Sequence, residues 1–162
     1  MKIRVVAQMF YKGYTLQGAE VPVYQQPDSA FWRNNNFITI RHSSEKDIYC
    51  AIPVEGDNIL RLQFDDVTEN PDGDLTLFNT EMARQIRDFT AQIDQNKELF
   101  VNCAAGISRS GAVGDVLNDY FNRYLSFNAL DDYYFKQLNK HIQPNPLVTR
   151  VLRKVFFEED AQ

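Results

Sequence analysis

The chain has 162 residues, 44% of them hydrophobic, with 17 Lys and Arg against 22 Asp and Glu. The net charge of -5 disfavours nucleic acids and anionic membrane surfaces as partners, because binding to them needs a positive surface. Two cysteines and two histidines are too few for a typical zinc site. No apolar run approaches the roughly 20 residues of a membrane-spanning helix and no secretion signal is evident, so we expect one cytoplasmic domain over residues 1–162.

The chain alternates short apolar strands with longer helical stretches, which favours an α/β fold. Strands are expected over residues 3–6, 37–40 and 59–64, and a further strand over residues 48–54. Residues 11–36 are expected to be irregular, because glycine and proline interrupt any periodicity there.

The second half is predicted to be mainly helical around one central strand. A helix is expected from Asn79 or Thr80 to about Asn96, because apolar residues recur there at helical spacing. The short apolar run 99–101 is typical of a strand that is buried on both faces. Further helices are expected over residues 110–124, 130–138 and 147–157.

The loop after that central strand carries the chemistry. Cys103 follows the strand directly, five residues separate it from Arg109, and a helix is expected to begin at Ser110. A short loop at a helix N-terminus turns its N–H groups inward and binds anions, and Gly106 supplies the backbone freedom that such a turn needs. The same donors stabilise a thiolate, so we expect the pKa of Cys103 to lie below about 8.5. A thiolate beneath a bound oxyanion indicates attack on phosphorus.

The segment from Cys103 to Ser110, Cys-Ala-Ala-Gly-Ile-Ser-Arg-Ser, resembles the signature loop of the protein tyrosine phosphatase superfamily. Its residues are most similar to those of dual-specificity phosphatases. Residues 60–67 and 143–146 resemble the strand with its acid loop and the turn before the last helix, and the likeness covers about residues 38–157. The resemblance implies a single-domain cysteine-phosphatase fold, with a central twisted, mostly parallel sheet flanked by helices.

The resemblance also implies a two-step hydrolysis that needs neither a metal nor another cofactor. Cys103 would attack the phosphoester and form a phosphocysteine, and Ser110 would hydrogen-bond the sulfur as it leaves. Asp66 would protonate the leaving group and later activate water, with Asp65 as the alternative acid. The phosphate would be held by the residues of the loop and the arginine that follows it: Ala104, Ala105, Gly106, Ile107, Ser108 and Arg109.

Asn102 departs from the family pattern, which usually has a histidine before the cysteine. Asparagine can still donate a hydrogen bond, so we expect a weakened or retuned enzyme, with a phospho-ligand-binding pseudophosphatase as the alternative. The residues between Cys103 and Arg109 are neutral, whereas phosphoinositide phosphatases tend to carry lysines there. Together with the acidic net charge, this favours phosphorylated protein as the substrate, at phosphotyrosine and also at phosphoserine or phosphothreonine, with a non-protein phosphoester as the alternative. The protein is expected to be a monomer.

A few other residues allow more than one interpretation. His42 is expected to be a solvated loop residue and His141 a surface or capping residue, although a Cys103–His141 pair would suit a cysteine protease. Cys50 is expected in the core, with a protective disulfide to the nucleophile as the alternative. Trp32 fits either the pocket wall or the core.

Overall fold

The computed structural model describes residues 1–12, 29–44 and 52–159. The strands in these ranges form one four-stranded sheet in the order β1-β4-β2-β3, and every pairing is parallel. The strands are β1 Ile3–Ala7, β2 Asn36–Arg41, β3 Ile59–Gln63 and β4 Leu99–Cys103. The sheet confirms the predicted α/β fold, and it brings the carboxyl ends of β3 and β4 to the same edge, where ligands of parallel sheets bind.

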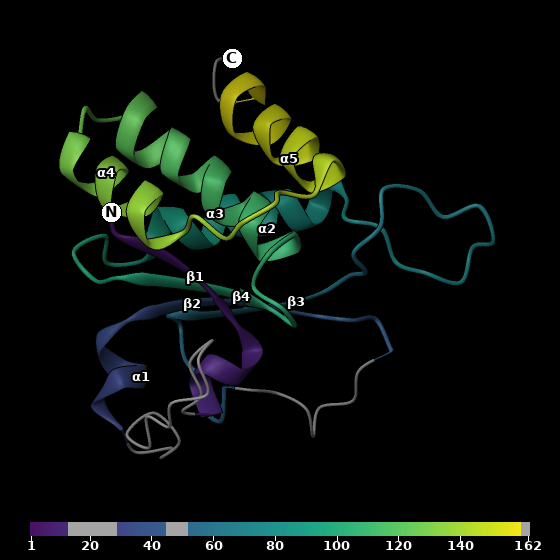
Figure 1. Cartoon of the computed structure of the whole chain (residues 1–162), viewed down its shortest axis with the longest axis horizontal. Helices are drawn as coiled ribbons and strands as arrows, with labels where there is room; N and C mark the ends of the chain where they lie inside the picture. Colours follow the sequence, from purple (N-terminus) through teal and green to yellow (C-terminus); the bar gives the residue numbers. More distant parts are fainter. Residues whose placement is uncertain (13–28, 45–51, 160–162) are drawn as a thin grey trace.

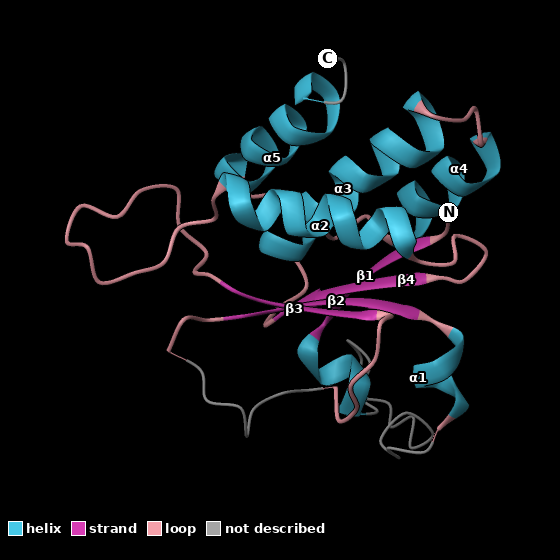
Figure 2. Cartoon of the chain, turned by 180° about the vertical axis from the view of Figure 1, so that it is seen from behind, coloured by secondary structure: helices cyan, strands magenta, loops and turns pink. Residues whose placement is uncertain are grey.

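Helices cover both faces of the sheet, with α2 to α5 on one face and α1 on the other (Figure 1 and, from behind, Figure 2). The helices are α1 Ala30–Asn34, α2 Thr80–Gln92, α3 Arg109–Asn118, α4 Ala129–Leu138 and α5 Pro146–Arg153. Helices α3 and α5 continue as the π-helical segments η4 Asp119–Tyr124 and η5 Lys154–Glu159, and β1 leads into the 3-10 helix η1 Gln8–Lys12. No helix within the described ranges is long and apolar enough to span a bilayer.

Helix α1 corrects the expectation of irregular structure over residues 11–36 for the part that is described, since residues 13–28 lie outside the described residues. Ser29 caps this helix by accepting a hydrogen bond from the Phe31 N–H at 3.2 Å. Phe31 and Trp32 pack against Phe37, with ring centroids 5.4 and 5.2 Å away. Because a five-residue helix is unstable in isolation, this aromatic packing holds it in place. Trp32 is buried and therefore belongs to the core.

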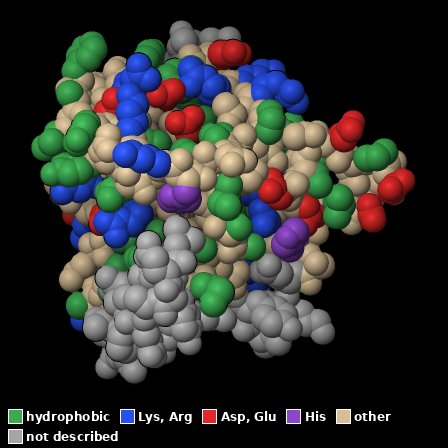
Figure 3. Space-filling view, in the orientation of Figure 1, with side chains coloured by type: hydrophobic (Ala, Val, Ile, Leu, Met, Phe, Trp, Pro, Cys, Tyr) green, Lys and Arg blue, Asp and Glu red, His purple; other side chains and the backbone are tan. Residues whose placement is uncertain are grey.

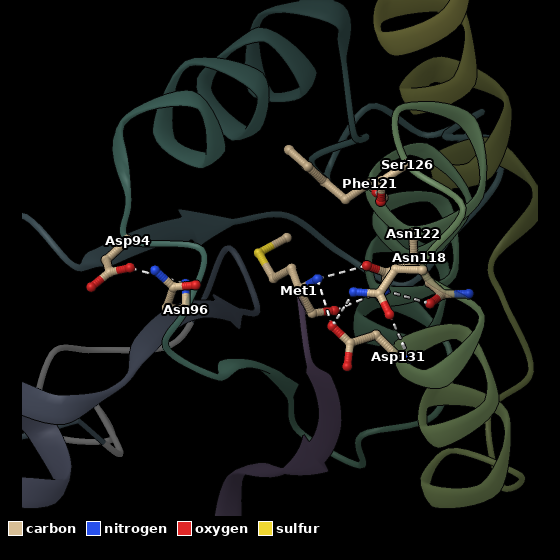
Figure 4. A network of polar contacts seen from close by, with 9 residues as sticks. Met1, Asp94, Asn96, Asn118, Phe121, Asn122, Ser126 and Asp131 are labelled. Atoms are coloured by element: carbon tan, nitrogen blue, oxygen red, sulfur yellow. Dashed lines mark hydrogen bonds and ion pairs between the residues drawn. The ribbon is translucent and has the colours of Figure 1, made fainter.

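Two other predicted boundaries differ in the structure. The first part of the strand expected over residues 48–54 lies outside the described residues, and residues 52–54 form no strand. Helix α2 ends at Gln92 rather than near Asn96, because the Asp94 side chain accepts a hydrogen bond from the Asn96 N–H at 2.9 Å and closes a tight turn there (Figure 4).

The sheet separates two apolar clusters. In β4, Val101 and Cys103 belong to the cluster on the α3 side, whereas Phe100 packs with Phe37 in the cluster on the α1 side. All residues of β4 are buried, which confirms the prediction of a strand covered on both faces. Because a fully buried Val or Phe side chain contributes about 1.5–3 kcal/mol, β4 is a firmly held support for the loop that follows it.

A polar network fixes β1 against η4 and α4 (Figure 4). The amino group of Met1 donates hydrogen bonds to Asn122 Oδ1 at 2.6 Å and to Asp131 Oδ2 at 2.9 Å. Asn122 Nδ2 donates in turn to the Met1 carbonyl and to Asn118 Oδ1. These contacts hold one end of β1, and the other end of the same strand supports the loop that contains Gly106.

Candidate active site

The loop between β4 and α3 consists of residues 104–108, which we name the phosphate loop. Its turn depends on Gly106, whose φ of 69° lies in the left-handed region that favours glycine. A Cβ at this position would also collide with the backbone of Val6 and Ala7 at the end of β1. Glycine is therefore required both by the backbone conformation and by the close packing of the phosphate loop on β1.

Cys103 lies at the base of this loop, and its buried Sγ is 3.1 Å from Ser110 Oγ. Burial by itself raises the pKa of the Cys103 thiol. Hydrogen bonds from the hydroxyl and N–H of Ser110 and from the N–H of Ile107, together with the charge of Arg109, outweigh burial and lower that pKa below its ordinary value. The direction agrees with the expectation from the sequence. Cys50, and with it the alternative disulfide, lies outside the described residues.

Arg109 is the first residue of α3, and its side chain is buried beside the phosphate loop. Its Nη1 donates a hydrogen bond of 2.9 Å to the carbonyl of Phe64, just after β3. Its Nε is buried and has no hydrogen-bond partner among the described residues. Since buried polar groups are nearly always paired, this guanidinium has a donor available for an oxyanion.

The adjacent carboxylates of Asp65 and Asp66 have opposite surroundings. Asp65 is buried and accepts hydrogen bonds from Ser43 Oγ at 2.6 Å, from the Thr76 N–H at 2.7 Å and from His42 Nδ1 at 2.8 Å. Burial by itself raises the pKa of Asp65, but the hydrogen bonds from Ser43, Thr76 and His42 hold it well below its usual range. Asp65 is thus a structural anion, and His42 is its partner rather than only a solvated loop residue.

Asp66 is exposed and lies against the phosphate loop. Its Oδ1 accepts one hydrogen bond from Ser108 Oγ and another from Asn145 Nδ2, each at 2.8 Å. The structure therefore brings Asp66, and not the side chain of Asp65, to the loop that contains the predicted phosphate-binding residues.

Asn145 is a site residue that the sequence reasoning missed. It is buried, and its Oδ1 caps α5 by accepting hydrogen bonds from the N–H groups of Leu147 and Val148 at 2.9 and 3.2 Å. Its backbone N–H donates to the carbonyl of Ser108 at 3.0 Å. Asparagine before Pro146 at a helix start is a recognisable cap signal, but the contact with Asp66 joins residues far apart in the chain.

A shallow pocket of about 430 Å³ opens beside the phosphate loop. Its lining consists of Asp66, Val67, Thr68, Glu69, Ser108, Asn145 and Pro146. Residues 65–77, which we name the acid loop, contain five acidic residues and no Lys or Arg. Figure 3 shows acidic side chains on the projecting loop that follows β3. The surface next to the phosphate loop is thus negatively charged.

Within the described residues, neither Asn102 nor His141 forms a hydrogen bond with the Cys103 thiol. Asn102 is buried, and its Oδ1 has no hydrogen-bond partner among the described residues. The Nε2 of His141 lies 3.1 Å from the carbonyl of Val5, so this half-buried histidine contacts β1 instead of forming a protease-type pair with Cys103. The part of the chain that the structure describes holds no cluster of three or more His, Cys, Asp or Glu suited to a metal ion.

Comparison with known proteins gives a likeness in structure. No family model and no curated protein matches the sequence. Human DUSP28 superimposes with a TM-score of 0.55 at 16% identity, over 98% of this chain and 90% of that one. PTPMT1 in complex with PI(5)P gives a TM-score of 0.52 at 15% identity, over 88% and 90%. The Cydia pomonella PTP-2 phosphatase gives 0.50 at 17% identity, over 81% and 78%. The chain therefore has the fold of the protein tyrosine phosphatases.

Proposed function

We propose that the protein is a cysteine-dependent phosphatase that hydrolyses phosphomonoesters through a phosphocysteine intermediate. One arrangement carries this proposal: a buried thiol with a lowered pKa, Cys103, ends β4 on one side of the phosphate loop, and a buried guanidinium, Arg109, begins α3 on the other side. The Nε of Arg109 has no hydrogen-bond partner among the described residues. Attack on a phosphoryl group needs a nucleophile and an anion-binding group held close together, and both lie here at one end of a rigid strand.

In the first step, the Cys103 thiolate attacks phosphorus and the bond to the leaving oxygen breaks. Arg109 and the N–H groups of the phosphate loop stabilise the charge on the remaining phosphoryl oxygens. Asp66, in its protonated form, gives its proton to the leaving oxygen, so the alcohol or phenol departs neutral. The product of this step is a phosphocysteine and an ionised Asp66.

In the second step, water attacks the phosphorus of the phosphocysteine while Asp66 accepts a proton from it. The S–P bond breaks and the Cys103 thiolate is regenerated. Ser110 Oγ, 3.1 Å from Sγ, donates a hydrogen bond to the departing sulfur. Phosphate is released and Asp66 is again protonated, so the cycle is balanced with water as the only co-reactant.

Asp66 is assigned as the acid and base on the basis of its surroundings. Asp65 accepts hydrogen bonds that stabilise its anion and lower its pKa, so it cannot supply a proton near neutral pH. Asp66 is exposed and hydrogen-bonded to Ser108 of the phosphate loop. It is therefore the carboxyl group that a leaving oxygen bound at this loop can reach.

Phosphorylated protein is the substrate class that the charge distribution supports. The acid loop lines the pocket beside the phosphate loop, and it repels a ligand that carries several phosphates more than one that carries a single phosphate on a peptide. The solved structure of PTPMT1 holds PI(5)P, which makes a phosphoinositide the second candidate. A phosphopeptide panel and a phosphoinositide panel, assayed in parallel, separate the two.

The decisive experiment compares the native protein with Cys103→Ser on a small aryl phosphate and on phosphopeptides. The native protein is expected to release phosphate. Cys103→Ser is expected to lose this activity because, near neutral pH, an alcohol is a far weaker nucleophile than a thiolate. Full activity of Cys103→Ser contradicts the proposal. A native protein that binds phosphopeptides without turnover is instead a phospho-ligand-binding pseudophosphatase.

A further inference from the structure

We infer that Asn145 is a positioning residue for the proton transfer, an inference that rests on the proposed phosphatase function. Asn145 holds the Asp66 carboxyl group against the phosphate loop and leaves Oδ2 of Asp66 as the oxygen that carries the transferred proton.

The two hydrogen bonds to Asp66 distinguish its two carboxyl oxygens. Asn145 Nδ2 and Ser108 Oγ both donate to Oδ1, each at 2.8 Å. An oxygen that already accepts from two donors is a poor place for a further proton, because a proton there would point at one of the donors. The acidic proton therefore belongs on Oδ2.

The orientation of the Asn145 amide is set by its other contacts. Its Oδ1 accepts from the N–H groups of Leu147 and Val148 at the start of α5. Because these donors require an oxygen, the NH2 group must lie on the opposite side, where it contacts Asp66 and, at 3.4 Å, the carbonyl of Val67. The side chain cannot flip without losing the helix cap.

Asn145 is also tied to the phosphate loop through its backbone. Its N–H donates to the Ser108 carbonyl at 3.0 Å, and the residue is buried. Asp66, by contrast, is exposed and lies near the start of the long acid loop. Asn145 thus fixes the Asp66 carboxyl group relative to α5 and the phosphate loop and restricts its orientations. Because proton transfer depends on the orientation of the donor, this restriction accelerates it.

The substitution Asn145→Ser separates this role from helix capping. Serine is as good an N-cap as asparagine, but it lacks the amide that reaches Asp66. The measurement is kcat/KM for two aryl phosphates, because this ratio reports the step in which the leaving group departs. Phenyl phosphate has a poor leaving group that needs a proton, whereas 2,4-dinitrophenyl phosphate has a leaving group that departs without one.

Asn145→Ser is expected to lower kcat/KM for phenyl phosphate about tenfold, which is less than the loss expected when the acid itself is removed. For 2,4-dinitrophenyl phosphate, kcat/KM is expected to change less than about threefold. Asp66→Asn should show the same selectivity with a larger loss, and adding Asn145→Ser to it should cause no further loss. Inhibition by inorganic phosphate and the thermal unfolding midpoint should stay close to those of the native protein.

Asn79→Ser is the matched control, because Asn79 caps α2 through the Met82 N–H at 2.9 Å and lies outside the site. It should leave both rates unchanged. Equal losses of Asn145→Ser on both substrates, or no loss on either, overturn the positioning role while the phosphatase function stands. A native protein that hydrolyses neither substrate overturns the phosphatase function and the role of Asn145 together.

Discussion

The phosphate loop and the acid loop meet at the same edge of the sheet, but they are held there in different ways. The phosphate loop is short, packs Gly106 onto the backbone of β1 and is followed by a buried arginine. The acid loop is long and projects from the body of the molecule (Figure 1), anchored by the hydrogen bonds of Asp65. The proposed anion site is thus built mainly from local backbone, whereas the proposed proton donor, Asp66, is placed by side-chain contacts between distant segments.

This contrast predicts that the largest loss comes from the phosphate loop side. Arg109→Lys keeps the charge but removes the planar guanidinium, so one group can no longer bond the Phe64 carbonyl and a phosphate together. We expect kcat/KM for an aryl phosphate to fall about 100- to 1,000-fold, as for the loss of a preorganised donor to a developing anion. Steady-state kinetics check this. A loss below about threefold would mean that Arg109 serves the fold through its hydrogen bond to Phe64 and does not bind the phosphate.

The two aspartates at the start of the acid loop should affect different properties, Asp66 the rate of catalysis and Asp65 the stability of the fold. Asp66→Asn is expected to lower kcat/KM for phenyl phosphate about 100-fold, the scale of general acid catalysis, with little change in the free energy of unfolding. Asp65→Asn is expected to destabilise the protein by about 1–3 kcal/mol, because it disturbs buried hydrogen bonds. Kinetics and chemical denaturation of both variants check the division, and the reverse assignment would show that Asp65 is the acid.

The same anchor predicts a pH dependence of stability. The pKa of Asp65 is lower in the folded than in the unfolded chain, so the unfolded chain binds the proton first as the pH falls. The stabilisation is therefore complete above about pH 4–5, the ordinary carboxyl range, and is lost as the pH falls from there toward the lowered pKa of the folded state. As the pH falls, the free energy of unfolding, measured from denaturation curves, should decrease less in Asp65→Asn than in the native protein. Identical acid sensitivity of the two proteins contradicts the anchor role.

The sequence reasoning succeeded where the structure is local. The eight residues from Cys103 to Ser110 contain the groups that lower the thiol pKa and the glycine of the turn. The short apolar runs predict β1 to β4, but the strand expected over residues 48–54 is not formed in its described part, residues 52–54. It missed α1, whose stability comes from contacts of Phe31 and Trp32 with β2 rather than from its own residues. The sequence leaves open which of Asp65 and Asp66 is the general acid, because two adjacent carboxylates do not differ in their local sequence. Burial and the distant residue Asn145 distinguish them.

A smaller loss tests the close packing of the phosphate loop. Gly106→Ala places a Cβ where φ is 69° and where the backbone of Val6 and Ala7 leaves no room. The left-handed conformation alone costs about 1–2 kcal/mol, and relief of the collision must shift the loop. We expect kcat/KM to fall about tenfold, the equivalent of about 1.4 kcal/mol. An unchanged rate and an unchanged inhibition constant for inorganic phosphate would show that the loop adapts freely.

The smallest effect is expected from the outer charges of the acid loop, since exposed charges are screened by salt and contribute about 0.2–1 kcal/mol each. Glu69→Gln, Asp72→Asn and Asp74→Asn together should lower kcat/KM for a phosphopeptide with basic flanking residues and raise it for one with acidic flanks, by about two- to fivefold each. A small aryl phosphate is the control, because it does not extend over the loop. The difference between peptides should shrink in high salt. If the peptide preference survives neutralisation, it arises from the shape of the pocket, and the acid loop then serves the reaction through Asp66 alone.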